Sequence, residues 1–161
     1  MKKLLSALLV LVMLLSLPGI GALAASDELT WSLDKKGTLT ISGKGEMPDY
    51  SGDTPPWVKY RDDIKAVVIE EGVTHIGAQC FQFCTKLKSV TIPSSVESIG
   101  AAAFYRCEKL SAVYYGGTAS DWNKIEIERY NKRLTSAELV IADTETSAPA
   151  PSEKPVGGKL K

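Results

Sequence analysis

The sequence predicts a short α/β solenoid with a parallel strand ladder, short helices and an N-terminal β-hairpin cap. Residues 73–95 and 96–118 match at nine positions over a period of 23, and eight of these positions are apolar or small. Each copy joins a segment that alternates like a strand to a segment with apolar residues at helical spacing. Copies at a fixed distance are typical of stacked repeats that share one continuous core. The paired positions are Val73/Val96, Ile76/Ile99, Gly77/Gly100, Ala78/Ala101, Phe81/Phe104, Cys84/Cys107, Lys86/Lys109, Leu87/Leu110 and Val90/Val113.

Residues 1–24 are predicted to be a signal peptide for export. Lys2 and Lys3 precede a long apolar run, a Pro-Gly pair then breaks the helix, and Ala22 and Ala24 offer small residues for cleavage. A retained membrane anchor is the alternative, because the apolar stretch is nearly long enough to span a bilayer. The helix breakers and small residues favour cleavage, so we expect no membrane insertion of the mature chain.

The charge balance gives no sign of a polyanionic partner. The chain has 19 Lys and Arg and 19 Asp and Glu residues, and cleavage after residue 24 removes two lysines, which leaves 17 against 19 and a net charge of −2. Neither sign dominates, so we expect no nucleic-acid partner. The remaining length suits one domain, which we expect to be a monomer.

Residues 25–59 are predicted to hold the hairpin cap and a degenerate first repeat. The turn falls at Lys35-Lys36-Gly37, and the residues before and after it alternate between apolar and polar. Such a hairpin would cover the core that the end of a solenoid otherwise exposes. Trp57, and Trp122 near the other end, are interpreted as end packing, with sugar stacking as the alternative. The apolar side is formed by Leu29, Trp31, Leu33, Leu39 and Ile41.

Residues 60–118 are predicted to form the repeats themselves. The segment from Leu87 to Ile92 alternates like a strand, and Pro93 ends it because proline cannot continue the ladder. Apolar residues then recur at helical spacing up to Phe104, which predicts a short helix. Gly100, at the entry to this segment, predicts a tight bend or a close approach of backbones.

Residues 119–143 are predicted to be a closing rung, and residues 144–161 a disordered tail or linker. Leu134, Ala137 and Leu139 lie 24 positions beyond Leu110, Val113 and Tyr115, as a loosened copy would. The tail has no hydrophobic periodicity and is rich in Pro, Ala, Ser and Thr. It is interpreted either as a free end or as the start of a further part of a longer surface protein.

These residues carry a family resemblance. The pattern Val-x-x-Ile-Gly-x-x-(Ala/Cys)-Phe-x-x-Cys-x-x-Leu-x-x-Val-x-Ile-Pro resembles the BspA-type leucine-rich repeat of secreted bacterial proteins, and the match is close over residues 64–118. Residues 29–50 resemble the opening hairpin of that family and residues 114–127 its closing rung. The resemblance implies a leucine-rich-repeat solenoid, a secreted or cell-surface location and a role in adhesion to host or bacterial proteins.

The three cysteines and the single histidine are weighed as possible sites. Cys84 and Cys107 occupy equivalent core positions, and Cys80 takes the position of an alanine in the next copy. Buried thiols explain this pattern best, with a disulfide or a zinc site as alternatives. His75 is interpreted as a surface residue whose equivalent is the polar turn residue Ser98.

No catalytic assembly is recognisable in the sequence. It has one histidine and neither a Gly-x-Ser-x-Gly nor a His-Glu-x-x-His motif. Its adjacent acids, such as Asp62 and Asp63, are typical of solvated turns, and a short solenoid offers no evident cleft for sugar hydrolysis. We therefore expect neither an enzyme nor a cofactor nor a metal site.

The exposed face of the parallel sheet is the candidate binding surface, because repeats of this class commonly bind there. Tyr114, expected to be exposed, and Lys88 form an aromatic-plus-cation group of the kind favoured at interfaces. The alternative is an ordinary sheet surface. The candidate residues are Lys65, Val68, Lys88, Thr91, Ser111 and Tyr114.

The sequence and the resemblance together predict an exported binding module. It would act in adhesion or recognition at the bacterial cell surface, with a host or bacterial surface protein or a glycan as its partner. The alternative, from a different class, is a structural spacer or a fragment of a larger surface protein with no ligand of its own.

Overall fold

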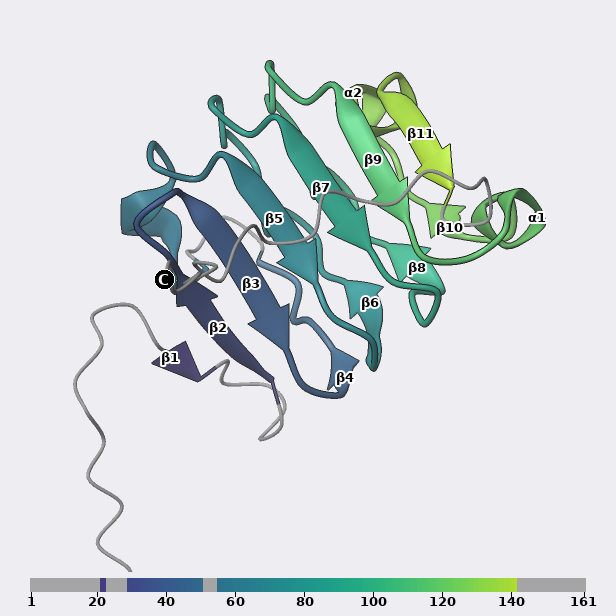
Figure 1. Ribbon diagram of the computed structural model, residues 1–161, viewed down its shortest axis with the longest axis horizontal. Coiled ribbons are helices and arrows are strands. Elements are labelled where there is room, and N and C mark those ends of the chain that lie inside the picture. Colours follow the sequence, from purple (N-terminus) through teal and green to yellow (C-terminus); the bar gives the residue numbers. More distant parts are fainter. Residues whose placement is uncertain (1–20, 23–28, 51–54, 142–161) are drawn as a thin grey trace, which may run out of the picture.

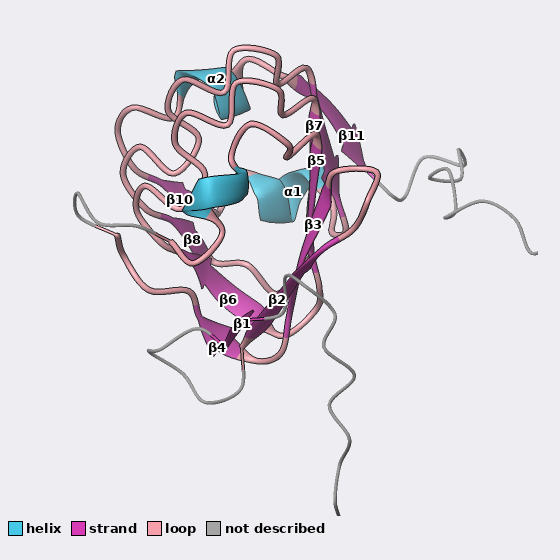
Figure 2. Cartoon of the chain, turned by 90° about the vertical axis from the view of Figure 1, so that its left-hand side faces the viewer, coloured by secondary structure: helices cyan, strands magenta, loops and turns pink. Residues whose placement is uncertain are grey.

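The computed structural model describes residues 21–22, 29–50 and 55–141. The predicted tail, and the predicted signal peptide apart from Gly21–Ala22, therefore lie outside the described residues. The described chain forms a short stack with one large and one small sheet on different sides (Figures 1 and 2). The elements are β1 (Gly21–Ala22), β2 (Thr30–Leu33), β3 (Thr38–Ser42), β4 (Gly45–Glu46), η1 (Val58–Tyr60), β5 (Ala66–Ile69), β6 (Val73–Ile76), β7 (Ser89–Ile92), β8 (Ser98–Ile99), β9 (Ala112–Tyr115), α1 (Ala119–Trp122), β10 (Glu126–Ile127), α2 (Lys132–Thr135) and β11 (Glu138–Ile141).

The large sheet has seven strands in the order β1-β2-β3-β5-β7-β9-β11. From β3 onward neighbouring strands are parallel, and each belongs to a successive rung of the stack. Within each of β5, β7 and β9 the second and fourth residues are buried and the other two are half-buried. The predicted fold class, a parallel ladder with an N-terminal hairpin cap, is confirmed.

The hairpin is part of the large sheet rather than a separate lid. Its strands β2 and β3 pair antiparallel, and β3 pairs parallel with β5. The turn is held by Asp34, whose carboxylate accepts hydrogen bonds from the backbone N–H groups of Lys36 and Thr38 at 2.8 Å each. Gly37 in this turn has φ +88°, a conformation that favours glycine. The hairpin therefore extends the ladder because β3 offers β5 an edge with unpaired backbone groups.

The short helix predicted within each repeat is wrong. Each full repeat instead has a second strand, β6 with four residues or β8 with two, followed by a chain of turns over 77–83 or 100–106. These strands form a second parallel sheet in the order β10-β8-β6-β4. Among the described residues, α-helical turns occur only near the C-terminal end, in α1 and α2.

The backbone of these turns explains why no helix forms. Gln79 and Phe83 have φ near +60°, a left-handed conformation that cannot continue a right-handed helix. Their N–H groups, and that of Phe81, donate to carbonyl oxygens of the next rung at 2.8–3.1 Å instead of to the carbonyl four residues earlier. The apolar spacing thus indicates which side chains are buried, whereas hydrogen bonds between rungs determine the backbone conformation.

The core is a continuous column along the stack. Phe81 and Phe104 are completely buried and stack with ring centroids 5.2 Å apart, as the repeat frame predicts. Trp57 extends this column by stacking on Phe81, with ring centroids 5.6 Å apart. Gly100 permits the rungs to lie this close, because a Cβ atom there would be 2.5 Å from the nitrogen of Ala78. The predicted close approach of backbones at this glycine is confirmed.

Two side chains complete the hydrogen bonding at the ends of the column. Between full rungs, the N–H of Phe81 donates to the carbonyl of Ala103 at 2.9 Å. At the N-terminal end the indole N–H of Trp57 donates to the carbonyl of Cys80 at 2.9 Å. At the C-terminal end the side-chain oxygen of Asn131 accepts from the N–H of Phe104 at 3.0 Å. Each side chain takes the place of a neighbouring rung's backbone, so the buried polar groups stay paired.

The register of the last strand differs from the prediction. Leu139 was expected to correspond to Tyr115, but it lies opposite Val113. The two extra residues are taken up where the chain forms α2 before β11. Leu139 is 37% exposed, because β11 is the last strand of the large sheet and nothing described follows it. Leu134, in contrast, is buried in the core as predicted.

Candidate binding surface

The outward residues of the large sheet lie in straight rows across the rungs. Val68 lies opposite Thr91, and Thr91 lies opposite Tyr114. All three are half-buried, whereas the residues on either side of them in each strand point into the core. A parallel ladder without bulges places equivalent positions side by side. The structure therefore brings these three predicted residues together on one face.

The remaining predicted residues flank this row where the strands begin. Lys65, Lys88 and Ser111 are exposed. The backbone N–H of Lys88 donates to the carbonyl of Lys65 at 2.8 Å, and that of Ser111 donates to the carbonyl of Lys88 at 2.9 Å. Tyr114 was expected to be exposed, but its place between two neighbouring strands leaves it half-buried. Lys65, Lys88 and Ser111 each lie one residue before β5, β7 and β9, so they flank the row at the start of the strands rather than belong to it.

Sequence reasoning missed how far this face extends. Thr40 of β3 lies opposite Val68, and Val140 of β11 lies opposite Tyr114, so the row has five members. Ser32 of β2 lies opposite Thr40 and continues the face onto the hairpin. The alternation of the hairpin sequence identifies its outward residues but not their alignment with the repeats. No described helix or strand lies over this face (Figures 1 and 2).

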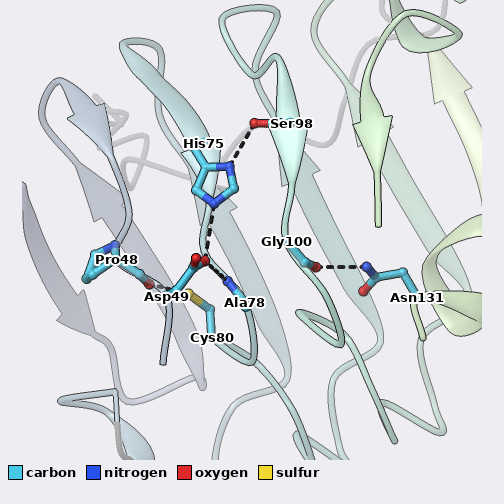
Figure 3. A network of polar contacts seen from close by, with 8 residues as sticks. All are labelled: Pro48, Asp49, His75, Ala78, Cys80, Ser98, Gly100 and Asn131. Atoms are coloured by element: carbon cyan, nitrogen blue, oxygen red, sulfur yellow. Dashed lines mark hydrogen bonds and ion pairs between the residues drawn. The ribbon is translucent and has the colours of Figure 1, made fainter. Parts of the chain in front are cut away.

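A polar network lies on the small sheet (Figure 3). His75 of β6 contacts the hydroxyl of Ser98 through Nδ1 at 2.7 Å and the carboxylate of Asp49 through Nε2 at 3.4 Å. The same carboxylate accepts a hydrogen bond from the backbone N–H of Ala78. His75 is thus a half-buried strand residue, and Ser98 lies in β8, not in a turn; their predicted equivalence is confirmed by the strand register.

This network is not arranged as a hydrolase triad. In such a triad Nε2 faces the serine and Nδ1 faces the carboxylate, whereas His75 has the reverse orientation. Asp49 also binds the backbone of the first full repeat, so it ties the segment after β4 to the turn that follows β6. The geometry supports a structural tie between the N-terminal cap and the repeats.

The hydrogen bond from Ala78 is the main reason that the pKa of Asp49 is below its ordinary value of 3.8, with the contact to His75 as a smaller cause. A depressed pKa adds stability that is present above the ordinary pKa and is lost as the pH falls through the folded value. We expect Asp49→Asn to lower the stability by about 0.5–1 kcal/mol near neutral pH, because the side chain is well exposed. The difference should begin to shrink as the pH falls below about 4 and should vanish once the pH is below the lowered pKa of Asp49 in the folded protein.

Thermal melts of both proteins between pH 2 and pH 7 would check this. Glu97→Gln, an exposed carboxylate for which no such hydrogen bond is seen in the described structure, serves as the matched control. A difference between wild type and Asp49→Asn that stays constant down to pH 2 would contradict the assigned role.

The three cysteines are buried free thiols, as interpreted from the sequence. Burial raises the pKa of the Cys84 thiol to about 12 and raises that of Cys107 as well. The Cys107 thiol donates to the carbonyl of Phe81 at 3.1 Å. A thiol with a raised pKa and no solvent contact is a poor nucleophile and metal ligand. Within the described ranges no group of three or more His, Cys, Asp or Glu residues could hold a metal ion.

Trp57 and Trp122 are placed as end packing, as interpreted from the sequence. Trp57 is almost completely buried. Trp122 is half-buried and packs edge-on against Tyr115, with ring centroids 5.2 Å apart. Burial leaves no face of Trp57 open for a sugar to stack on. The described segments contain no helix that is long and apolar enough to cross a membrane.

Residues 59–139 match the family model described as "BspA type Leucine rich repeat region (6 copies)". This match covers half of the chain together with all the full rungs, and the chain belongs to the BspA-type leucine-rich repeat family. None of the curated proteins matches the sequence.

Two solved structures of bacterial leucine-rich repeat proteins are similar to this chain. One is a leucine-rich repeat protein from Eubacterium ventriosum, 36% identical, with a TM-score of 0.56 over 63% of this chain and 26% of that chain. The other is a leucine rich cell surface protein from Faecalibacterium prausnitzii, 18% identical, with a TM-score of 0.36 over 77% of this chain and 43% of that chain. This chain thus spans about a quarter of the length of the first protein.

Proposed function

We propose that this chain is an exported binding module of the bacterial cell surface, which contacts a protein or a glycan with the outer face of its large sheet. The observation that carries the proposal is the five-member row from Thr40 to Val140, which lies in register and which no described element covers. Export is supported by the composition of residues 1–24, and binding by membership in a leucine-rich repeat family.

The chemistry of this face suits contact with a partner. Its rows are made of small hydroxyl and β-branched residues, which give a flat and weakly polar surface. Tyr114 is the large aromatic residue on it, and Lys88 lies one rung away where the strands begin. A tyrosine that is already half-buried loses little side-chain entropy when a partner covers it. We expect it to be the anchor of the interface.

We expect Tyr114→Ala to weaken binding about thirtyfold, which corresponds to about 2 kcal/mol for an anchor tyrosine. Exported protein would first be screened against matrix proteins, mucins and bacterial surfaces, and each hit would then be measured by surface plasmon resonance. Lys88→Ala should act mainly by lowering the association rate, since a charge at the rim steers the encounter.

Glu97→Ala is the matched control, because Glu97 is exposed and precedes β8 of the small sheet. Binding that survives Tyr114→Ala and Lys88→Ala but is lost in Glu97→Ala would show that the large sheet is the wrong face. A screen in which no surface or protein is bound would support the alternative, a structural spacer with no ligand of its own.

A further inference from the structure

A second surface combines aromatic and arginine side chains on the loops that lead into the strands of the large sheet. We call it the arginine–aromatic strip. Phe83, Tyr105 and Tyr130 are three of the four exposed large hydrophobic residues among those described, and their exposed fractions are 42%, 38% and 63%. All four arginines of the sequence lie beside them. The strip consists of Arg61, Phe83, Tyr105, Arg106, Arg129, Tyr130 and Arg133.

The rings form a ladder with one member on each of three successive rungs. Phe83 and Tyr105 pack edge-on with centroids 5.7 Å apart, and Tyr105 and Tyr130 do so at 6.4 Å. The loops that carry them run along the upper edge of the stack in Figure 1, from η1 to α2. Their position is set by the rungs, because the N–H of Phe83 donates to the carbonyl of Tyr105 at 2.8 Å.

An arginine stacks against each ring. The guanidinium carbon lies 5.7 Å from the ring centroid for Arg61 over Phe83, and 5.6 Å for Arg129 over Tyr130. Arg106 lies 5.7 Å from Tyr105 and also contacts Glu108 at 3.3 Å. No carboxylate among the described residues forms an ion pair with Arg61 or Arg129. A stacked guanidinium keeps its N–H donors free at its rim, where they can bind a carboxylate in two places.

The local charge is positive although the formal net charge of the chain is zero. Two depressions lie on the strip, one beside Phe83 and one between Tyr105 and Tyr130. Five cationic side chains line them, against two carboxylates. These residues are Lys59, Arg61, Asp62, Arg106, Glu108, Lys132 and Arg133.

The backbone carries large side chains here at positions that favour glycine. Phe83, Arg106 and Tyr130 have φ of 60°, 60° and 67°. Bulky residues rarely adopt this left-handed conformation. Gln79 and Ala102 have the same conformation, so it belongs to the turns of each full rung, and the strip is the place where large side chains occupy it.

We propose that the arginine–aromatic strip binds an acidic segment of a partner protein, separately from the outer face of the large sheet. Carboxylate side chains would bind the rims of Arg61 and Arg129, and apolar parts of the segment would pack against the ring edges. Tyrosine and arginine are the residues enriched at the centres of protein interfaces.

The test uses the full exported chain and a fluorescein-labelled peptide of alternating glutamate and glycine, with a glutamine–glycine peptide as the neutral probe. Fluorescence anisotropy should detect the acidic peptide and not the neutral one, and the affinity should fall as salt is raised. Arg61→Gln and Arg129→Gln should each weaken binding about tenfold. Lys44→Gln, which removes the same charge from an exposed residue between β3 and β4, should leave binding unchanged.

Phe83→Gly keeps the proposal falsifiable if an arginine variant folds poorly. Glycine suits the observed φ, so the melting temperature should be preserved while binding of the acidic peptide weakens. The proposal is overturned if Lys44→Gln weakens binding as much as Arg129→Gln, or if the acidic peptide does not bind. It is also overturned if polygalacturonate, an anionic glycan, binds and the acidic peptide does not.

Discussion

Phe104→Ala is expected to destabilise the protein by about 3–5 kcal/mol, because the cavity it leaves lies in the middle of the core. Phe104 is completely buried and stacks on Phe81 at 5.2 Å. The total stability of a domain of this size is about 5–15 kcal/mol, so at least about a fifth of it would be lost. Thermal and urea melts of wild type and variant would measure the change.

The control for this variant is the same substitution at an exposed phenylalanine. Phe83 is 42% exposed, and Phe83→Ala is expected to cost less than about 1 kcal/mol. Equal melting temperatures for wild type and Phe104→Ala would mean that the aromatic column does not form the core.

Trp57→Ala is expected to have a comparable effect of about 3–5 kcal/mol, although Trp57 lies outside the full repeats. The indole is almost completely buried, stacks on Phe81 at 5.6 Å and packs edge-on against Trp31 at 6.1 Å. Its loss would remove the end of the aromatic column and the hydrogen bond to the carbonyl of Cys80. Thermal and urea melts of wild type and Trp57→Ala would measure the change.

Trp57→Phe separates the two contributions. Phenylalanine fills most of the site but cannot donate to Cys80, so about 1–3 kcal/mol should be lost for the unpaired buried carbonyl. Trp122→Phe is the control, because Trp122 is half-buried and caps the opposite end against Tyr115. If Trp122→Phe were as damaging as Trp57→Ala, the stack would depend mainly on its C-terminal end.

Much of the fold was determined by local sequence. The period of 23 identifies the rungs, and the alternation from Leu87 to Ile92 predicts β7 and the side chains that it buries. The same alternation around the turn at Gly37 predicts the hairpin. It also places Val68, Thr91 and Tyr114 on a common face of the large sheet. These predictions succeed because buried positions recur with the period of the strand and of the repeat, and apolar residues occupy those positions.

The tertiary structure alone decided how the remaining backbone groups are paired. Apolar spacing up to Phe104 was interpreted as helical, but the N–H groups of this segment's counterpart bind the next rung. The cap residue Asn131 lies 27 positions from the N–H that it accepts, and Arg129 and Tyr130 join the strip only through stacking of rungs. A hydrogen bond to another rung does not change the pattern of apolar and polar residues around the donor, so the sequence pattern cannot predict it. The sequence by itself therefore determined which side chains form the core of this protein. The stacking of the rungs decided the path of the turns, the caps and the arginine–aromatic strip, because these depend on contacts between distant residues.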